Sequence, residues 1–205
     1  MSETKIKICG LFRPCDAEFV NSARPDFAGF VFYEKSRRYV TFKEAQKLRE
    51  SIRPEIRTAG VFVDASLEWI AALYRDKTIG IVQLHGGEDD LFIKRLRQTL
   101  PHAEIWKAFK IRSEKDLLAA ERSCADRVLL DNGYGTGECF DWSLIKSFSR
   151  PFILAGGLTP QNIPEAVLRF HPYAVDLSSG VEKDGLKDRD KIAAAVEAIR
   201  SIEEY

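Results

Sequence analysis

The stretch PFILAGGLTPQNIPEAVLRF, residues 151–170, decides the fold class of this chain. Its first six residues, 151–156, form a short and almost entirely apolar run, which is typical of a strand buried on both faces of a parallel sheet. Two glycines follow, and then Thr159 and Asn162, each closely followed by a proline, predict the start of a helix. A buried strand, a tight turn and a helix together make one unit of an α/β fold.

The same unit recurs along the whole chain. Strand-like apolar runs are expected at residues 5–10, 27–33, 57–63, 79–85, 104–109, 127–131, 151–156 and 173–179. Helix-like amphipathic stretches follow them, near residues 14–24, 41–53, 66–76, 88–99, 113–122, 141–148, 161–170 and 188–203.

Eight such units in 205 residues fit a closed (β/α)8 barrel, a TIM barrel, at the small end of its size range. We therefore predict an α/β fold with a single barrel domain over residues 1–205. An open doubly wound sheet is the second choice, because the chain has eight regular units and lacks a Rossmann fingerprint.

The composition argues against several classes of protein. The chain has 31 Lys and Arg against 31 Asp and Glu, so its formal net charge of zero disfavours a large sequence-independent nucleic-acid surface. No apolar run approaches the roughly 20 residues that a membrane-spanning helix needs, and the N-terminus MSETKIKICG lacks the apolar core of a signal peptide. We expect a cytoplasmic protein without membrane partners. The sequence leaves the choice between monomer and homodimer open.

The cysteines and histidines form no pattern typical of a metal site. None of the four cysteines stands in CxxC spacing, and the three histidines form neither HxxxH nor HExxH. In a reducing compartment we expect free thiols at all four positions, which are Cys9, Cys15, Cys124 and Cys139.

In a (β/α)8 barrel the active site lies at the carboxyl ends of the strands. The turns AGG and SSG follow the seventh and eighth predicted strands, where this fold usually binds phosphate. Glycines that merely make tight turns are the alternative. Applied to all eight strands, the rule selects Cys9, the loop 34–38, Asp64, His85, Asp131, Gly156, Gly157 and residues 176–180.

Cys9 and Asp131 are the candidates for proton transfer. They end the first and sixth predicted strands, so a substrate in the barrel mouth would lie between them. A thiol can act as a base only if its pKa falls toward neutrality, and a carboxyl can act as an acid only if its pKa rises. Taken alone, Cys9 is better explained as a packed core thiol, and Asp131 is equally well explained as a helix or loop cap.

The motifs together resemble one family, phosphoribosylanthranilate isomerase of tryptophan biosynthesis. They are KICGLFRP (7–14), GFVFYEKSRRYV (29–40), VQLHG (82–86), LLDNGYGTGECFDW (129–142), LAGGLTPQN (154–162) and DLSSGVEKDGLKD (176–188). The resemblance implies a (β/α)8 barrel that needs no cofactor. It also implies the Amadori rearrangement of N-(5-phosphoribosyl)anthranilate to 1-(2-carboxyphenylamino)-1-deoxyribulose 5-phosphate.

Carried over by position, the resemblance implies a general base at Cys9 and a general acid at Asp131. Arg38, rather than Arg37, would face the carboxylate of the substrate. The remaining implied residues are His85 and Asp176 for the substrate, and Gly156, Gly157, Ser179 and Gly180 for its phosphate.

Two positions depart from the family pattern. Phe12 stands where the family usually has Thr, and Tyr134 displaces one glycine of a loop that usually reads GGTG. Neither position is a proposed acid or base.

Two other hypotheses stay open. A different phosphate-binding barrel isomerase, such as the aminoimidazole isomerase of the histidine pathway, would carry Asp at the position of Cys9. A catalytically silent barrel that binds a sugar phosphate or a partner enzyme would not need an intact set of Cys9, Asp131 and Arg38.

Overall fold

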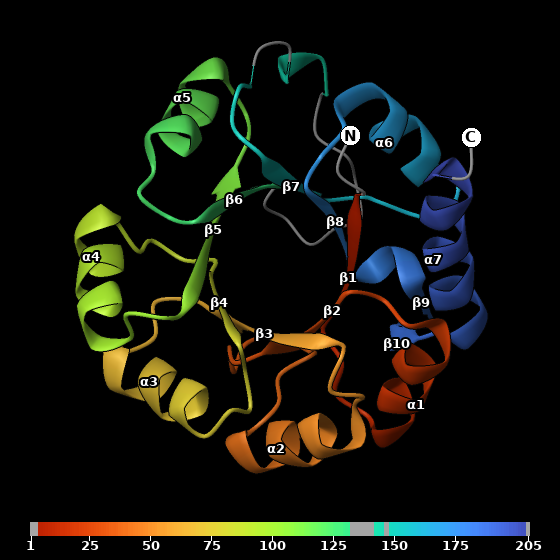
Figure 1. Ribbon diagram of the computed structural model, residues 1–205, viewed down its shortest axis with the longest axis horizontal. Coiled ribbons are helices and arrows are strands. Elements are labelled where there is room, and N and C mark those ends of the chain that lie inside the picture. Colours follow the sequence, from red (N-terminus) through yellow and green to blue (C-terminus); the bar gives the residue numbers. More distant parts are fainter. Residues whose placement is uncertain (1–3, 132–141, 146–147, 204–205) are drawn as a thin grey trace.

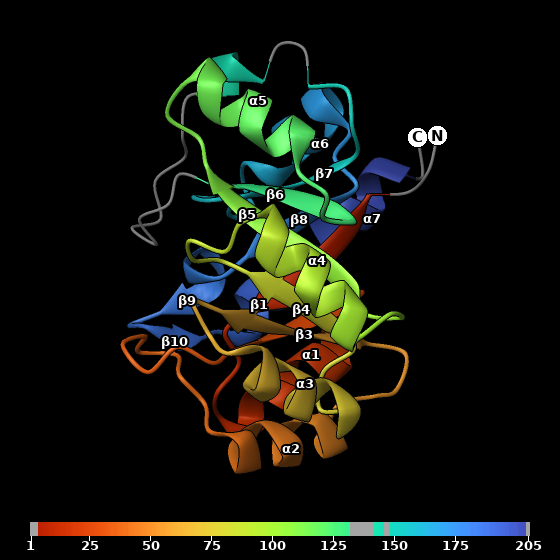
Figure 2. The same ribbon diagram turned by 90° about the vertical axis from the view of Figure 1, so that its left-hand side faces the viewer.

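The predicted barrel is confirmed. The structure, a computed structural model, describes residues 4–131, 142–145 and 148–203. Within these residues, eight parallel strands follow one another around a closed ring, and β8 pairs with β1 to complete it (Figure 1). The helices surround this ring on the outside (Figures 1 and 2).

The elements lie close to the ranges that the sequence predicts. The strands are β1 (Lys5–Cys9), β2 (Phe27–Val31), β3 (Arg57–Phe62), β4 (Ile81–Leu84), β5 (Glu104–Lys110), β6 (Arg127–Asp131), β7 (Phe152–Ala155) and β8 (Ala174–Leu177). The helices are α1 (Pro14–Ala23), α2 (Phe42–Ser51), α3 (Leu67–Arg75), α4 (Asp90–Thr99), α5 (Glu114–Arg122), α6 (Ile163–Phe170) and α7 (Arg189–Glu203).

Two details differ from the prediction. Where a helix was expected over residues 141–148, the described residues form only the 3-10 turn η1 (Trp142–Leu144). After β8 the chain makes a second 3-10 turn, η2 (Ser179–Val181), and a small antiparallel hairpin of β9 (Glu182–Lys183) and β10 (Leu186–Lys187). This hairpin stands beside the barrel mouth and matters for the site below.

The helix starts follow the capping signals in the sequence. Thr41 and Glu44, three residues apart, form a capping box, in which the Thr41 hydroxyl accepts from the Glu44 amide and the Glu44 carboxylate accepts from the Thr41 amide. Ser66 caps α3, and its hydroxyl accepts from the amide of Trp69. Within the described residues, no helix has both the length and the apolar character needed to cross a membrane.

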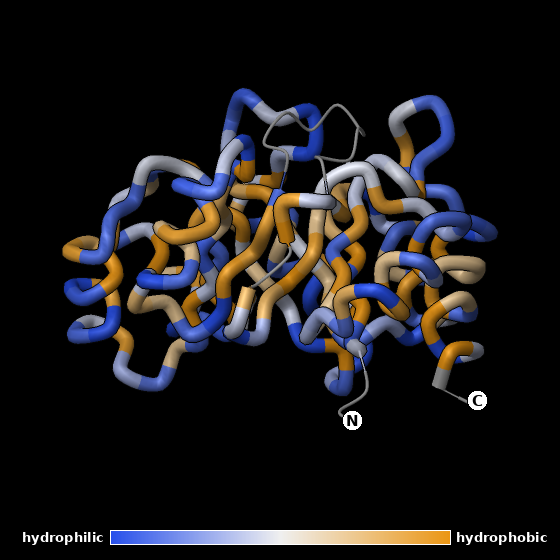
Figure 3. The backbone as a smooth tube through the Cα atoms, turned by 90° about the horizontal axis from the view of Figure 1, so that it is seen from above, coloured by the Kyte–Doolittle hydropathy of each residue, from blue (hydrophilic) through white to orange (hydrophobic). Residues whose placement is uncertain are grey.

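The hydrophobic core has two layers, one inside the barrel and one between the strands and the helices. In Figure 3 the hydrophobic residues follow the middle of the molecule, and hydrophilic residues gather at its upper and lower ends. Ile6 and Ile8 of β1 belong to the outer layer. Because side chains alternate along a strand, Lys7 and Cys9 point into the barrel.

Candidate active site

A cavity of about 370 Å³ opens at the carboxyl ends of the strands. It brings together all nine site residues expected from the sequence, which are Cys9, Arg38, His85, Asp131, Gly156, Gly157, Asp176, Ser179 and Gly180. A larger hollow of about 490 Å³ lies near Pro54 and Pro101, at the amino ends of the strands, and contains none of them. We therefore take the cavity at the carboxyl ends as the candidate active site.

Cys9 ends β1 and is only 8% exposed. It pairs in register with Gly29 of β2, where a Cβ atom would lie 2.9 Å from the Cys9 sulfur. The thiol therefore has room because its neighbour has no side chain. Burial raises the pKa of the Cys9 thiol, and the nearby charge of Lys7 offsets only part of this rise. This direction is opposite to the fall in pKa that the sequence argument required of a base.

Lys7 lies below Cys9 on the same inward face of β1 and is completely buried. Its Nζ atom donates a 2.8 Å hydrogen bond to Oδ2 of Asp176, the residue paired with it in register on β8. Burial alone would lower the pKa of Lys7, but the charges of Asp176 and Cys9 more than offset this, and the pKa is raised. Lys7 is therefore a buried cation. The Oδ1 atom of Asp176 is buried and has no hydrogen-bond partner among the described residues.

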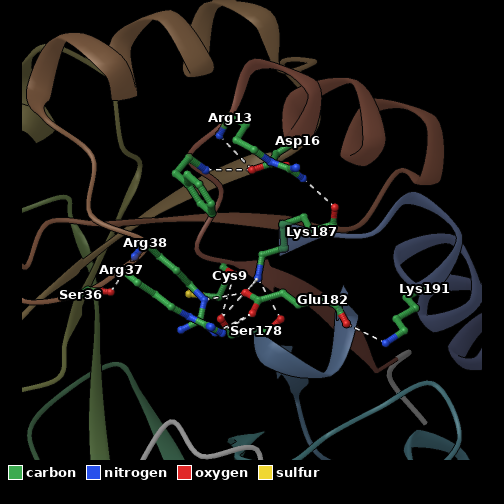
Figure 4. A network of polar contacts seen from close by, with 11 residues as sticks. Cys9, Arg13, Asp16, Ser36, Arg37, Arg38, Ser178, Glu182, Lys187 and Lys191 are labelled. Carbon is green, nitrogen blue, oxygen red and sulfur yellow. Dashed lines mark hydrogen bonds and ion pairs between the residues drawn. The ribbon is translucent and has the colours of Figure 1, made fainter. Parts of the chain in front are cut away.

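Glu182 of the β9–β10 hairpin joins the two loops beside the cavity (Figure 4). It accepts hydrogen bonds from Nε and Nη2 of Arg38 at 2.6 and 2.9 Å, and from Nη2 of Arg37 at 2.5 Å. The buried Nζ of Lys187 donates to it at 2.7 Å and also donates to the carbonyl oxygen of Ser178 at 2.9 Å. Burial alone would raise the pKa of Glu182, but hydrogen bonds from Arg38 and Lys187 hold it below its usual value.

The two arginines differ in their position. The Arg37 side chain is 58% exposed, whereas that of Arg38 is 13% exposed and lines the cavity. Because Glu182 uses the Nε and Nη2 edge of Arg38, the Nη1 atom lies on the other edge of the guanidinium. A planar guanidinium can bind one carboxylate on each edge, so Arg38 can be held by the protein and still bind an anion.

His85 and Asp131 contact one another inside the cavity. The Nε2 atom of His85, which directly follows β4, lies 3.3 Å from Oδ2 of Asp131 at the end of β6. The Nδ1 atom of His85 is buried and has no hydrogen-bond partner among the described residues. In the closed ring, β7 and β8 separate Asp131 from Cys9, so these two side chains reach the cavity from different sides.

The turns after β7 and β8 pack directly on one another. Gly156 and Gly157 both have positive φ, at +82° and +68°, a conformation that favours glycine. A Cβ atom at Gly180 would lie 1.8 Å from the carbonyl oxygen of Leu158, so only glycine fits there. The Ser178 hydroxyl donates to the carbonyl oxygen of Cys9 at 3.2 Å and so ties the turn after β8 to the end of β1.

Three charged residues of the site have no counterpart among the expected residues, namely Lys7, Glu182 and Lys187. The first alternates with Ile6 and Ile8 along β1, a pattern that usually places the polar residue toward solvent, so the sequence does not single it out. The other two occur in the motif DLSSGVEKDGLKD, but their contact depends on the path of the hairpin.

The other singled-out positions lie away from the chemistry or outside the described residues. Phe12 is not among the residues that line the cavity, and its side chain packs partly buried against the outer core. Cys15 and Cys124 are free thiols, as expected. Tyr134 and Cys139 lie outside the described residues.

The fold and the cavity define a (β/α)8-barrel enzyme with its site at the carboxyl ends of the strands. A family model described as N-(5'-phosphoribosyl)anthranilate (PRA) isomerase matches residues 6–198. The chain belongs to this family.

Individual relatives agree with this membership. The N-(5'-phosphoribosyl)anthranilate isomerase of Endomicrobium trichonymphae is 45% identical over 203 residues, which cover 97% of this chain and 99% of the relative. The crystal structure of phosphoribosyl anthranilate isomerase from Thermotoga maritima is 34% identical, with a TM-score of 0.87 and coverage of 97% and 99%. A further isomerase structure, in complex with reduced 1-(o-carboxyphenylamino)-1-deoxyribulose 5-phosphate, is 33% identical, with a TM-score of 0.85 and the same coverage.

Proposed function

We propose that this isomerase of tryptophan biosynthesis converts N-(5-phosphoribosyl)anthranilate to 1-(2-carboxyphenylamino)-1-deoxyribulose 5-phosphate by proton transfer, with Asp131 as acid and Cys9 as base. The observation that carries the proposal is that both side chains line one cavity and reach it from different strands. A proton can therefore be given at one atom of the substrate and taken from another.

The reaction begins at the furanose ring. Asp131 donates a proton to the ring oxygen, and the lone pair of the anthranilate nitrogen supplies the electrons that break the C1′–O bond. The product of this step is an open-chain Schiff base. Cys9 then removes the proton from C2′, which gives an enolamine, and tautomerisation gives the ketone. No cofactor is needed, because the substrate supplies its own electron pair.

His85 is placed to assist the acid. Its Nε2 atom lies 3.3 Å from Asp131 and can hold this carboxyl in one orientation toward the ring oxygen.

Three sets of contacts would hold the substrate. Arg38 binds the anthranilate carboxylate through its Nη1 edge, while Glu182 fixes the guanidinium. The Oδ1 atom of Asp176 accepts from a hydroxyl of the sugar, because it is buried without a partner among the described residues. The phosphate lies against the two packed turns, whose residues are Gly156, Gly157, Ser179 and Gly180.

The cytoplasm is the location we propose for this enzyme. The role of the family in amino-acid biosynthesis supports this location.

An isomerase assay with freshly prepared substrate, on wild type and on Cys9→Ser, tests the proposal. We expect the variant to fold but to lose roughly 10²- to 10⁴-fold in turnover, the usual contribution of one acid or base. Cys124→Ser is the matched control, because Cys124 is an exposed free thiol outside the cavity. Near-normal turnover in Cys9→Ser would refute the role of Cys9. Wild-type turnover of an aminoimidazole substrate alone would favour the histidine-pathway type of isomerase.

A further inference from the structure

The proposed mechanism does not use Lys7, although this residue is the charged group closest along the chain to Cys9. It is completely buried, and its side chain points into the barrel below the thiol. A Cβ atom at Gly29 would lie 2.9 Å from the Cys9 sulfur and 3.1 Å from Cε of Lys7. The sulfur and the end of the lysine side chain therefore occupy the same small space above Gly29.

A buried ion pair at this position is weak support for the fold. Replacing such a pair by apolar side chains of similar volume is often neutral or stabilising, because desolvation of both charges offsets their attraction. The interior layer below it is apolar, built from Phe27, Ala59, Ile81 and Trp106 among others. The Lys7–Asp176 pair lies next to this apolar layer, on the side of the Cys9 thiol.

We propose that Lys7 is a positioning residue for Cys9: its ammonium group, held in place by Asp176, stabilises the thiolate that removes the C2′ proton. This inference rests on the proposed function, since it concerns the base of that mechanism. The short bond to Asp176 fixes the ammonium group, so that the same cation faces the sulfur before and after proton transfer. Electrostatic stabilisation by a group already in place costs no reorganisation during the reaction.

The other charged groups around Cys9 are already engaged. Lys187 of β10 is bonded to Glu182 and Ser178. Arg38 lies over Gly10, next to Cys9, and is also bonded to Glu182. Asp176 of β8 opposes thiolate formation, and it is the group that Lys7 neutralises. Lys7 is the strongest influence that lowers the pKa of the buried thiol.

The test measures the ionisation of Cys9 directly, through the ultraviolet absorbance of the thiolate as a function of pH. Subtracting the spectrum of Cys9→Ser in each background isolates Cys9 from the other thiols. We expect Lys7→Met to raise the pKa of Cys9 by about one unit or more, so that its thiolate fraction at neutral pH falls about tenfold. The acidic limb of the profile of kcat against pH should move upward with it, while KM changes little.

Two further variants separate the effect of Lys7 on Cys9 from a general effect of changing a buried ion pair. Lys7→Met with Asp176→Asn removes both charges and so avoids leaving a buried carboxylate unpaired. It should still raise the pKa of Cys9, because the direct neighbour of the sulfur is lost. Lys107→Met is the matched control, since Lys107 is also buried and paired, 2.9 Å from Glu88, but lies outside the cavity. It should leave the thiol titration unchanged.

An unchanged or lower pKa of Cys9 in both Lys7 variants overturns the inference, as does an equal shift in Lys107→Met. The titration does not depend on catalysis. If Cys9→Ser retains turnover, the proposed base is wrong whatever the titration shows. If Cys9→Ser is inactive and the titration does not move, only the role of Lys7 is wrong.

Discussion

Replacing Glu182 by Gln removes the charge that joins the loop after β2 to the hairpin after β8. The change preserves the size of the side chain but replaces one acceptor oxygen by an amide donor. That donor would face Arg37, Arg38 or Lys187, all of which are donors themselves. The substitution therefore leaves positive charges close together without a carboxylate.

The expected magnitude follows from burial. The side chains of Glu182 and Lys187 are 3% and 0% exposed, and breaking a buried ion pair costs about 3–5 kcal/mol. Arg37 is largely exposed and can be hydrated, so the lower end applies and we expect a loss of about 3 kcal/mol. In a chain of 205 residues this lowers Tm by roughly 6–12 °C. Because Arg38 is also released, KM for the substrate should rise about tenfold, with a smaller change in kcat.

Urea and thermal unfolding, together with steady-state kinetics, measure both effects. Glu104→Gln is a suitable control, because the Arg57–Glu104 pair has side chains that are 46% and 22% exposed. Such a pair contributes about 0–1 kcal/mol. The pKa of Glu182 is lowered in the folded protein, so its share of stability is present above the ordinary carboxyl pKa. That share is lost as pH falls through the lowered value, and Glu182→Gln should not show this loss. Equal stability and equal KM in Glu182→Gln and wild type would refute the reasoning.

Three further predictions concern the substrate contacts. Arg38→Ala should weaken binding of a reduced product analogue more than Arg37→Ala, because only Arg38 lines the cavity; equal losses in a titration would contradict this. Asp131→Asn should abolish kcat while affinity for the analogue stays within about tenfold, or ~1.4 kcal/mol; retained turnover would remove Asp131 from the mechanism. Gly180→Ala should weaken inorganic phosphate binding and lower stability, since its Cβ would lie 1.8 Å from a backbone oxygen. Gly80→Ala is the control and should be tolerated, because its Cβ would meet only an atom at 3.9 Å. Similar behaviour of the two variants would show that the packed turns are not constrained.

The barrel was predictable from the sequence because each buried strand is a compact apolar run that ends in a turn. The place of the site followed from the parallel arrangement, which brings all strand ends to one side. The ends of several elements differ by one or two residues from expectation, as for β4 at Ile81–Leu84, because apolar runs extend beyond the hydrogen-bonded ladder. The extent of the single domain, residues 1–205, stays a prediction.

The contacts within the site were not predictable in the same way. Lys7 stands in the alternation KIKIC, where a polar residue between apolar ones usually faces solvent. In β1, Ile6 and Ile8 face the helices, and the charged Lys7 faces the barrel interior. The contact between His85 and Asp131 joins two strands that are not neighbours in the ring, β4 and β6, so no local pattern contains it. The contacts of Glu182 with Arg37 and Arg38 form only because the β9–β10 hairpin lies beside the loop after β2.

The pairing of β8 with β1 also has a consequence for how the protein is made. Lys7 and Asp176 are 169 positions apart along the chain, and their bond lies on the seam where the ring closes. During synthesis, Cys9 leaves the ribosome near the beginning, but its strand gains one of its two neighbours only after β8 has emerged. In a nascent chain that stops before β8, Asp176 is absent, so Lys7 lacks the partner that fixes its ammonium group near Cys9. The cavity also lacks the wall that β8 forms. Activity should therefore appear during translation only after β8 has emerged and the ring has closed.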